Sequence, residues 1–167
     1  MWNTSSRTNG RRDLKVKSLR GCLLIGNSRW HWALQHSNEW KFSHTQPDPA
    51  RLKDLNVEFF TWAAVGIYPC DPFLNPSQHL GIKDVPLINL PPWLGIDRAL
   101  GALEAFKKAK ENNNHGRGLL IADAGTVLSI TRITANGEFA GGQLVPGLRL
   151  QLSSMAKGTK NLKDPGN

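Results

Sequence analysis

The sequence has 167 residues, 40% of them hydrophobic, and a formal net charge of +8. This length and apolar content suffice for the core of one or two small domains. No apolar run approaches the roughly 20 residues that a membrane helix needs, so we expect no membrane partner. Cys22 and Cys70 form neither a C-x-x-C metal site nor a disulfide framework. We expect both to be small core residues in a reducing cytoplasm.

The positive charge is concentrated at the N-terminus. Residues 1–20 contain six Lys or Arg residues and one acid, and they are rich in Ser, Thr and Asn. Because they lack apolar periodicity, we expect a disordered tail without catalytic importance. Arg and Ser also occur in transit peptides, and a basic arm can bind nucleic acid. The tail has neither an amphipathic helix nor interleaved aromatic residues, so we expect no nucleic-acid partner.

The first recognisable unit is a strand, a turn and a second strand. Residues 22–25 are apolar, Gly26-Asn27-Ser28 favours a turn, and residues 29–35 alternate bulky and polar side chains. A Gly-Asn dipeptide by itself is usually only a hairpin turn. This unit therefore gains weight only if the chain repeats it.

The middle of the chain contains mixed elements. We predict a short helix over residues 47–55 with Asp48 as its cap, an interior strand over 57–66, and a short strand over 85–90 within proline-rich irregular chain. Residues 95–111 form a clearer pattern. Their apolar positions repeat at helical spacing and predict an amphipathic helix. These positions are Ile96, Ala99, Leu100, Leu103 and Phe106.

A second strand–turn–strand unit follows. Residues 119–122 are an apolar run that predicts a buried strand, and Asp123-Ala124-Gly125-Thr126 predicts a tight turn. Its glycine lets the backbone approach a ligand, and its threonine offers an N–H and a hydroxyl to an anion. A strand over residues 127–134, a hairpin at Asn136-Gly137 and a helix over residues 147–157 complete the pattern. Two such units suggest a duplicated fold that binds phosphate without a Walker-A loop.

Taken in order, several segments resemble the type III pantothenate kinases, which belong to the acetate and sugar kinase/Hsp70/actin superfamily. The matching segments are Gly26-Asn27-Ser28, residues 94–100, Asp123-Ala124-Gly125-Thr126, residues 141–148 and, more weakly, Gly158-Thr159. The resemblance implies an α/β chain with an actin-like ATPase (ribonuclease H-like) fold. Its first lobe would span residues 21–111. Residues 119–167 would form the beginning of a truncated second lobe.

The same resemblance implies ATP-dependent phosphorylation of pantothenate, the first step of coenzyme A biosynthesis, by a cytoplasmic homodimer. Asp97 would be the general base, and Gly95, Ile96, Asp97, Arg98 and Thr159 would bind the substrate. The ATP-binding residues would be Gly26, Asn27, Ser28, Arg29 and Thr126. Asp123 would hold a monovalent cation, K⁺ or NH₄⁺, beside the Mg²⁺ that accompanies ATP.

The residues alone leave simpler readings open. Asp97 could only complement the helix dipole, Arg98 could be a solvated helix residue, and Asp123 could cap its turn. The chain also departs from the family pattern, since Leu24 replaces an acid that assists Mg²⁺ and phosphate, and Pro91 replaces a substrate-contacting Tyr. The alternative is therefore a truncated, inactive relative that retains ligand or partner binding.

Overall fold

The computed structural model of this chain describes residues 18–55 and 57–163. Most of the predicted tail, residues 1–17, lies outside the described residues. Strand β1 begins at Ser18, so the last residues assigned to the tail, Ser18 to Arg20, belong to a sheet. The chain is a mixed α/β structure with two sheets and three α-helices among the described residues.

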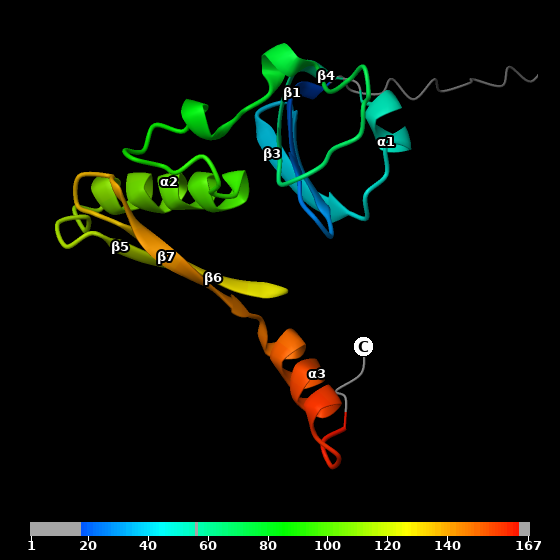
Figure 1. Cartoon of the computed structure of the whole chain (residues 1–167). Coiled ribbons are helices and arrows are strands. Elements are labelled where there is room, and N and C mark those ends of the chain that lie inside the picture. The colour runs from blue at the N-terminus through cyan, green and yellow to red at the C-terminus, as the bar shows by residue number, and fades with distance from the viewer. Residues whose placement is uncertain (1–17, 56, 164–167) are drawn as a thin grey trace, which may run out of the picture.

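The first sheet has the strand order β3-β2-β1-β4 (Figure 1). The predicted strand–turn–strand unit is confirmed as β1 (Ser18–Ile25) paired antiparallel with β2 (Trp30–His36), which pairs with β3 (Glu39–Thr45). Strand β4 (Val57–Ala64) lies parallel to β1, at the end of the sheet rather than in its interior.

The first sheet has a hydrophobic core of its own. Two tryptophans of β2 and Trp62 of β4 are buried together with Leu52 of α1 (Ala50–Lys53). The predicted helix over residues 47–55 is a single turn, and its N-cap residue is Pro49 rather than the predicted Asp48. Asp48, one residue earlier, accepts a hydrogen bond from the Ala50 N–H at 3.0 Å.

The proline-rich segment that follows is irregular, apart from the 3₁₀ turns η1 (Pro76–Gln78) and η2 (Ile82–Asp84). The strand predicted over residues 85–90 is wrong, because only a single bridge joins Ile88 to Glu138. Pro86 cannot donate to a strand ladder. The segment nevertheless packs against the second sheet, where Ile88 accepts a hydrogen bond from the Phe139 N–H at 2.9 Å.

Helix α2 (Ile96–Glu111) matches the predicted amphipathic helix and lies between the two sheets (Figure 1). Its apolar face forms a second core, which includes Ala63 of the first sheet and Ile133 of the second. Ala99 and Ala102 are fully buried, so small side chains allow the helix backbone to approach closely.

The second sheet is the antiparallel series β5 (Leu119–Ala124), β6 (Val127–Ile133) and β7 (Phe139–Pro146). The β6–β7 hairpin turns at Gly137, whose φ of +82° favours glycine. Helix α3 (Leu148–Gly158), which is close to its predicted range, extends away from both sheets (Figure 1).

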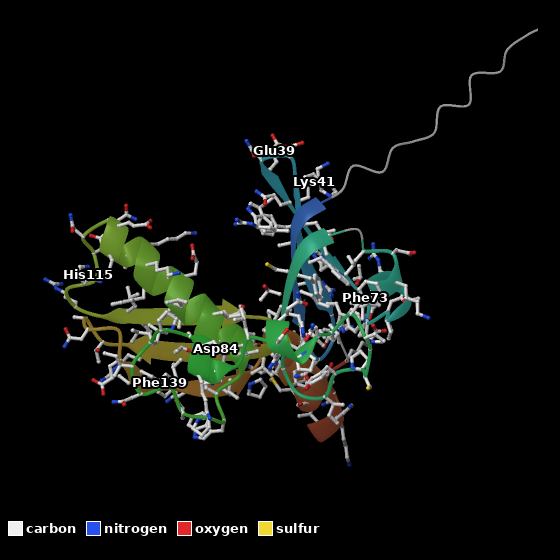
Figure 2. The ribbon with its side chains drawn as sticks, turned by 90° about the horizontal axis from the view of Figure 1, so that it is seen from above. Glu39, Lys41, Phe73, Asp84, His115 and Phe139 are labelled. Carbon is white, nitrogen blue, oxygen red and sulfur yellow. The ribbon has the colours of Figure 1, made fainter. Side chains whose placement is uncertain are left out.

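Helix α2 covers one face of the second sheet, and the described residues leave the other face exposed. Leu120, on that open face, is 71% exposed. The prediction that residues 119–122 form a buried strand is therefore right about the strand but holds for one face only, since Leu119 and Ile121 pack against the second core. Cys22 and Cys70 are also exposed, contrary to expectation. Figure 2 shows Glu39 and Lys41 at the outer end of β3, and His115 at the far end of α2.

Candidate functional site

The N-terminus of α2 presents Asp97 to solvent. Gly95 is the N-cap residue, and Asp97 lies in the first turn with an exposed side chain. The Asp97 Oδ1 atom lies 2.5 Å from the position that a Cβ on residue 95 would occupy. A side chain at residue 95 would therefore move the carboxylate away from this position over the start of the helix. The carboxylate accepts a hydrogen bond from the Arg98 N–H at 2.8 Å.

Arg98, the next residue, is anchored to the second sheet. Its Nε and Nη2 atoms donate to Thr131 Oγ1 at 3.2 Å and 3.0 Å, and Nη2 also donates to the Ile130 carbonyl at 2.9 Å. Arg98 is therefore a half-buried link between α2 and β6. The reading of Arg98 as a solvated helix residue is wrong.

The register of the second sheet relates α2 to the turn between β5 and β6. Thr131 faces α2, and Ser129, two residues earlier, faces the same side about 7 Å along the strand. Asp123 lies directly opposite Ser129, so it too belongs to the α2 side of the sheet. At the other end of α2, Phe106 lies against Gly137. The N-terminus of α2 is therefore directed toward the β5–β6 turn.

The β5–β6 turn, Asp123-Ala124-Gly125-Thr126, is exposed throughout. Inside it the Gly125 N–H donates to the Val127 carbonyl at 3.2 Å, and the Thr126 carbonyl accepts from Gly147 at 2.9 Å. The predicted buried setting of Asp123 is wrong. Asp123 lies near the end of the edge strand β5, whereas Ser129, directly opposite it on the central strand β6, is buried.

The β1–β2 turn carries the other predicted ATP-binding residues. The Gly26 N–H donates to the Arg29 carbonyl at 3.0 Å, and Asn27, Ser28 and Arg29 are exposed. Leu24, immediately before this turn, packs against the second core around α2. No hydrogen bond between described residues joins this turn to the β5–β6 turn.

Two predicted substrate-binding residues lie elsewhere. The Ile96 side chain is buried in the second core, so only its backbone N–H can face a ligand. Thr159 follows α3, away from α2 (Figure 1), and its hydroxyl donates to the Met155 carbonyl at 3.0 Å. The structure brings Gly95, Asp97, Arg98 and the β5–β6 turn to one side of the second sheet, but not Thr159.

The residues around the β5–β6 turn offer oxygen ligands for a hard cation. No group of three or more His, Cys, Asp or Glu side chains among the described residues could hold a metal ion. Asp123 supplies one exposed carboxylate beside the carbonyl groups of the turn. Such a donor set fits a weakly held K⁺, or a Mg²⁺ that takes its other ligands from phosphate and water.

The sequence model described as "Type III pantothenate kinase" matches residues 62–165, which is more than half of the chain. The chain belongs to the type III pantothenate kinase family. A type III pantothenate kinase of Synechococcus elongatus is 36% identical over 160 residues, which cover 84% of this chain and 61% of that protein. Another from Synechococcus sp. (strain JA-3-3Ab) is 39% identical, with 86% of this chain and 58% of the relative covered.

This member of the family spans about three fifths of the length of these relatives. A solved structure of the Aquifex aeolicus PPX-GPPA enzyme aligns over 81% of this chain and 55% of that chain. The alignment has 6% sequence identity and a TM-score of 0.34, a similarity too low to establish a shared fold. No helix among the described residues is both long and apolar enough to cross a bilayer.

The sequence analysis assigned no role to the residues on which the site rests, although Gly142 and Gly147 belong to the matching segment 141–148. Thr131 receives Arg98, while Gly142 and Gly147 allow close backbone contact with β6 and with the β5–β6 turn. The sequence does contain a signal for the Thr131 contact, because Ser129 and Thr131 are polar residues two positions apart, and so lie on the one face of the strand that α2 covers. Polar side chains on such a face need partners.

Proposed function

We propose that this chain carries part of the site for ATP-dependent phosphorylation of pantothenate to 4'-phosphopantothenate, the first step of coenzyme A biosynthesis. The observation that carries the proposal is the arrangement of Asp97 and Arg98. In a member of this family, both residues stand at a helix N-terminus directed toward an exposed turn that ends in Gly125-Thr126. Free backbone N–H groups and the helix dipole favour bound anions there.

In the proposed reaction Asp97 is the general base. Its carboxylate takes the proton of the pantothenate hydroxyl as that oxygen attacks the γ-phosphorus of ATP. The new O–P bond replaces the bond to the β-phosphate oxygen, and ADP leaves. An exposed carboxylate can perform this step when substrate binding brings the hydroxyl within hydrogen-bond reach. Most of the acceleration in phosphoryl transfer comes from positioning and from charge neutralisation.

Arg98 and Thr159 are proposed to bind the substrate with the backbone of Gly95 and Ile96. The Arg98 Nη1 atom makes no hydrogen bond to a described residue, so it remains available for a substrate oxygen. The proposed ATP contacts are Gly26, Asn27, Ser28, Arg29 and Thr126. Asp123 is proposed to hold K⁺ or NH₄⁺, and Mg²⁺ would accompany the phosphates.

We further propose an actin-like ATPase architecture in a cytoplasmic homodimer. Residues 21–111 would be the first lobe and residues 119–167 the beginning of the second. This division is supported by two sheets, each opening with a strand–turn–strand unit and each contacting α2. Thr159 could then meet the other substrate-binding residues only through a rearrangement of α3 or through a second copy.

The test is a phosphorylation assay on the purified chain with ATP, Mg²⁺, K⁺ and pantothenate, with product detected by ³¹P NMR. A chimera extended by the C-terminal segment of the Synechococcus elongatus relative is assayed in parallel. Product from either protein supports the proposal. Saturable pantothenate binding without turnover in both would favour the inactive relative that only binds ligand. If neither protein binds or phosphorylates pantothenate, both the proposed reaction and the pantothenate-binding alternative are overturned.

A further inference from the structure

We propose that Thr131 and Gly142 position Asp97 by holding Arg98 in a fixed place on the second sheet. The seat of Arg98, as we name it, consists of Thr131 Oγ1, the Ile130 carbonyl and the side-chain-free backbone of Gly142. The role in positioning Asp97 rests on the proposed function. The seat itself can be tested without any enzymatic activity.

The seat holds the Arg98 side chain through several hydrogen bonds. Thr131 is 2% exposed, and its hydroxyl accepts from both Nε and Nη2 of Arg98. The Ile130 carbonyl accepts from the same Nη2 at 2.9 Å. Hydrogen bonds from a charged donor to buried acceptors are stronger than neutral ones. The planar guanidinium is thus held through two of its three nitrogens.

Gly142 of β7 lies directly opposite Thr131 and leaves room for the guanidinium. A Cβ at this position would overlap the Ile130 carbonyl oxygen and lie 2.7 Å from Arg98 Nη2. Any side chain at residue 142 must therefore displace the backbone of β6 at Ile130, and it also presses on the Arg98 guanidinium. This requirement gives a physical reason for a glycine within the segment 141–148, to which the proposed reaction assigns no role.

The seat also restrains Asp97, the residue before Arg98. Asp97 and Arg98 are adjacent in the first turn of α2, where the helix has not yet gained its full set of intrahelical hydrogen bonds. Fixing the Arg98 side chain on β6 fixes this turn, and the Asp97 carboxylate accepts from the Arg98 N–H. The free Nη1 atom of the seated Arg98 is fixed by the same contacts. Thr131 and Gly142 are therefore positioning residues.

The experiment compares three changes at the seat with a matched control. Thr131→Val keeps the shape but removes the acceptor, Thr131→Ser keeps the hydroxyl, and Gly142→Ala adds the obstructing methyl group. Gly101→Ala in α2 is the control, because nothing lies within 4 Å of its new methyl group. NMR measures solvent exchange of the Arg98 Nε–H and of the amides in the first and last turns of α2.

We expect the Arg98 Nε–H and the first-turn amides to exchange at least about tenfold faster in Thr131→Val and Gly142→Ala. Thr131→Ser should resemble the parent, and Gly101→Ala should exchange no faster than the parent, because alanine favours the helix more than glycine does. The last turn of α2 should not change in the variants of the seat. An unprotected Nε–H in the parent, or an unchanged rate in Thr131→Val, would overturn the seat. Faster exchange along the whole helix would point to general destabilisation and would contradict a positioning role.

The kinetic arm separates the two proposals. In whichever protein phosphorylates pantothenate, Thr131→Val should lower kcat about tenfold and leave KM for ATP unchanged, and Thr131→Ser should restore kcat. An unchanged kcat would refute the positioning of Asp97, even where exchange confirms the seat. If neither the parent chain nor the chimera has activity, the proposed function fails and the positioning role fails with it. The exchange rates then decide on the seat alone.

Discussion

The two sheets of this protein differ in how they are supported. The first has its own core, in which Trp62 is 2% exposed, together with α1 and the loops around it. The second is covered on one face by α2, and its open face carries Leu120 at 71% exposure. Yet Asp123, Thr126, Thr131 and the segment 141–148 all belong to the second region. Most of the proposed site outside the β1–β2 turn thus belongs to the less protected region, where the β5–β6 turn is exposed to solvent.

The largest expected effect is that of Asp97→Asn, which tests whether the reaction takes place where α2 faces the second sheet. If Asp97 is the general base, turnover in an active protein should fall by about 10²–10⁴-fold. Thermal stability should stay the same, because the carboxylate is exposed. The matched control is Glu104→Gln on the same helix, which removes only a surface pairing with Lys108 at 3.6 Å. Parent-like turnover in Asp97→Asn would remove this residue from the mechanism.

A second pair of variants compares the two regions directly. Trp62→Ala should cost about 3–5 kcal/mol, since it leaves a cavity in the first core. Leu120→Ala should cost less than about 0.5 kcal/mol, because the side chain is mostly in solvent. Urea unfolding of both variants measures the difference. A loss at Leu120 as large as that at Trp62 would mean that the open face is covered in solution.

Amide hydrogen exchange sharpens the comparison along the backbone. We expect the amides of residues 119–133 to exchange at least about tenfold faster than those of residues 57–65, because the second sheet opens at a lower free energy. Mass spectrometry of peptides from both segments measures this ratio. Equal protection would show that the second sheet is as stable as the first, and would contradict the difference inferred from burial.

The smallest expected effect concerns Cys22 in the first region. Although the residue is exposed overall, it borders an apolar cavity of about 230 Å³ between the first sheet and Leu100 of α2, and partial desolvation there raises the pKa of its thiol. The folded protein then holds less thiolate than the unfolded chain at the same pH, so alkylation by iodoacetamide at pH 8 should be several-fold slower than in urea.

The same pKa shift makes the stability of the folded protein depend on pH. A raised thiol pKa in the folded state contributes stability that is present below the pKa of the unfolded thiol and is lost as the pH rises through the folded value. The matched control is Cys22→Ala, in which this pH dependence should disappear. Equal alkylation rates in the folded and unfolded protein would contradict the effect of the apolar surroundings.

Local patterns predicted most of the elements. The strands around Gly26 and around Asp123, the hairpin at Gly137 and helix α2 follow from apolar periodicity and turn residues, which act over a few neighbouring positions. The strand expected over residues 85–90 failed for a local reason, since Pro86 cannot join a ladder. The motifs likewise identified Asp97 and the β5–β6 turn as candidate site elements, whose roles stay predictions.

What the sequence by itself determined about this protein is most of its elements, though not β3, and its family, because both depend on short segments and their order. Only the tertiary structure decided burial and partnership. Asp123 follows an apolar run but is exposed, since it lies near the end of an edge strand. Arg98 reads as a surface residue but is held by Thr131 across 33 positions of sequence. Such contacts depend on how helix and sheet pack, which no local pattern contains.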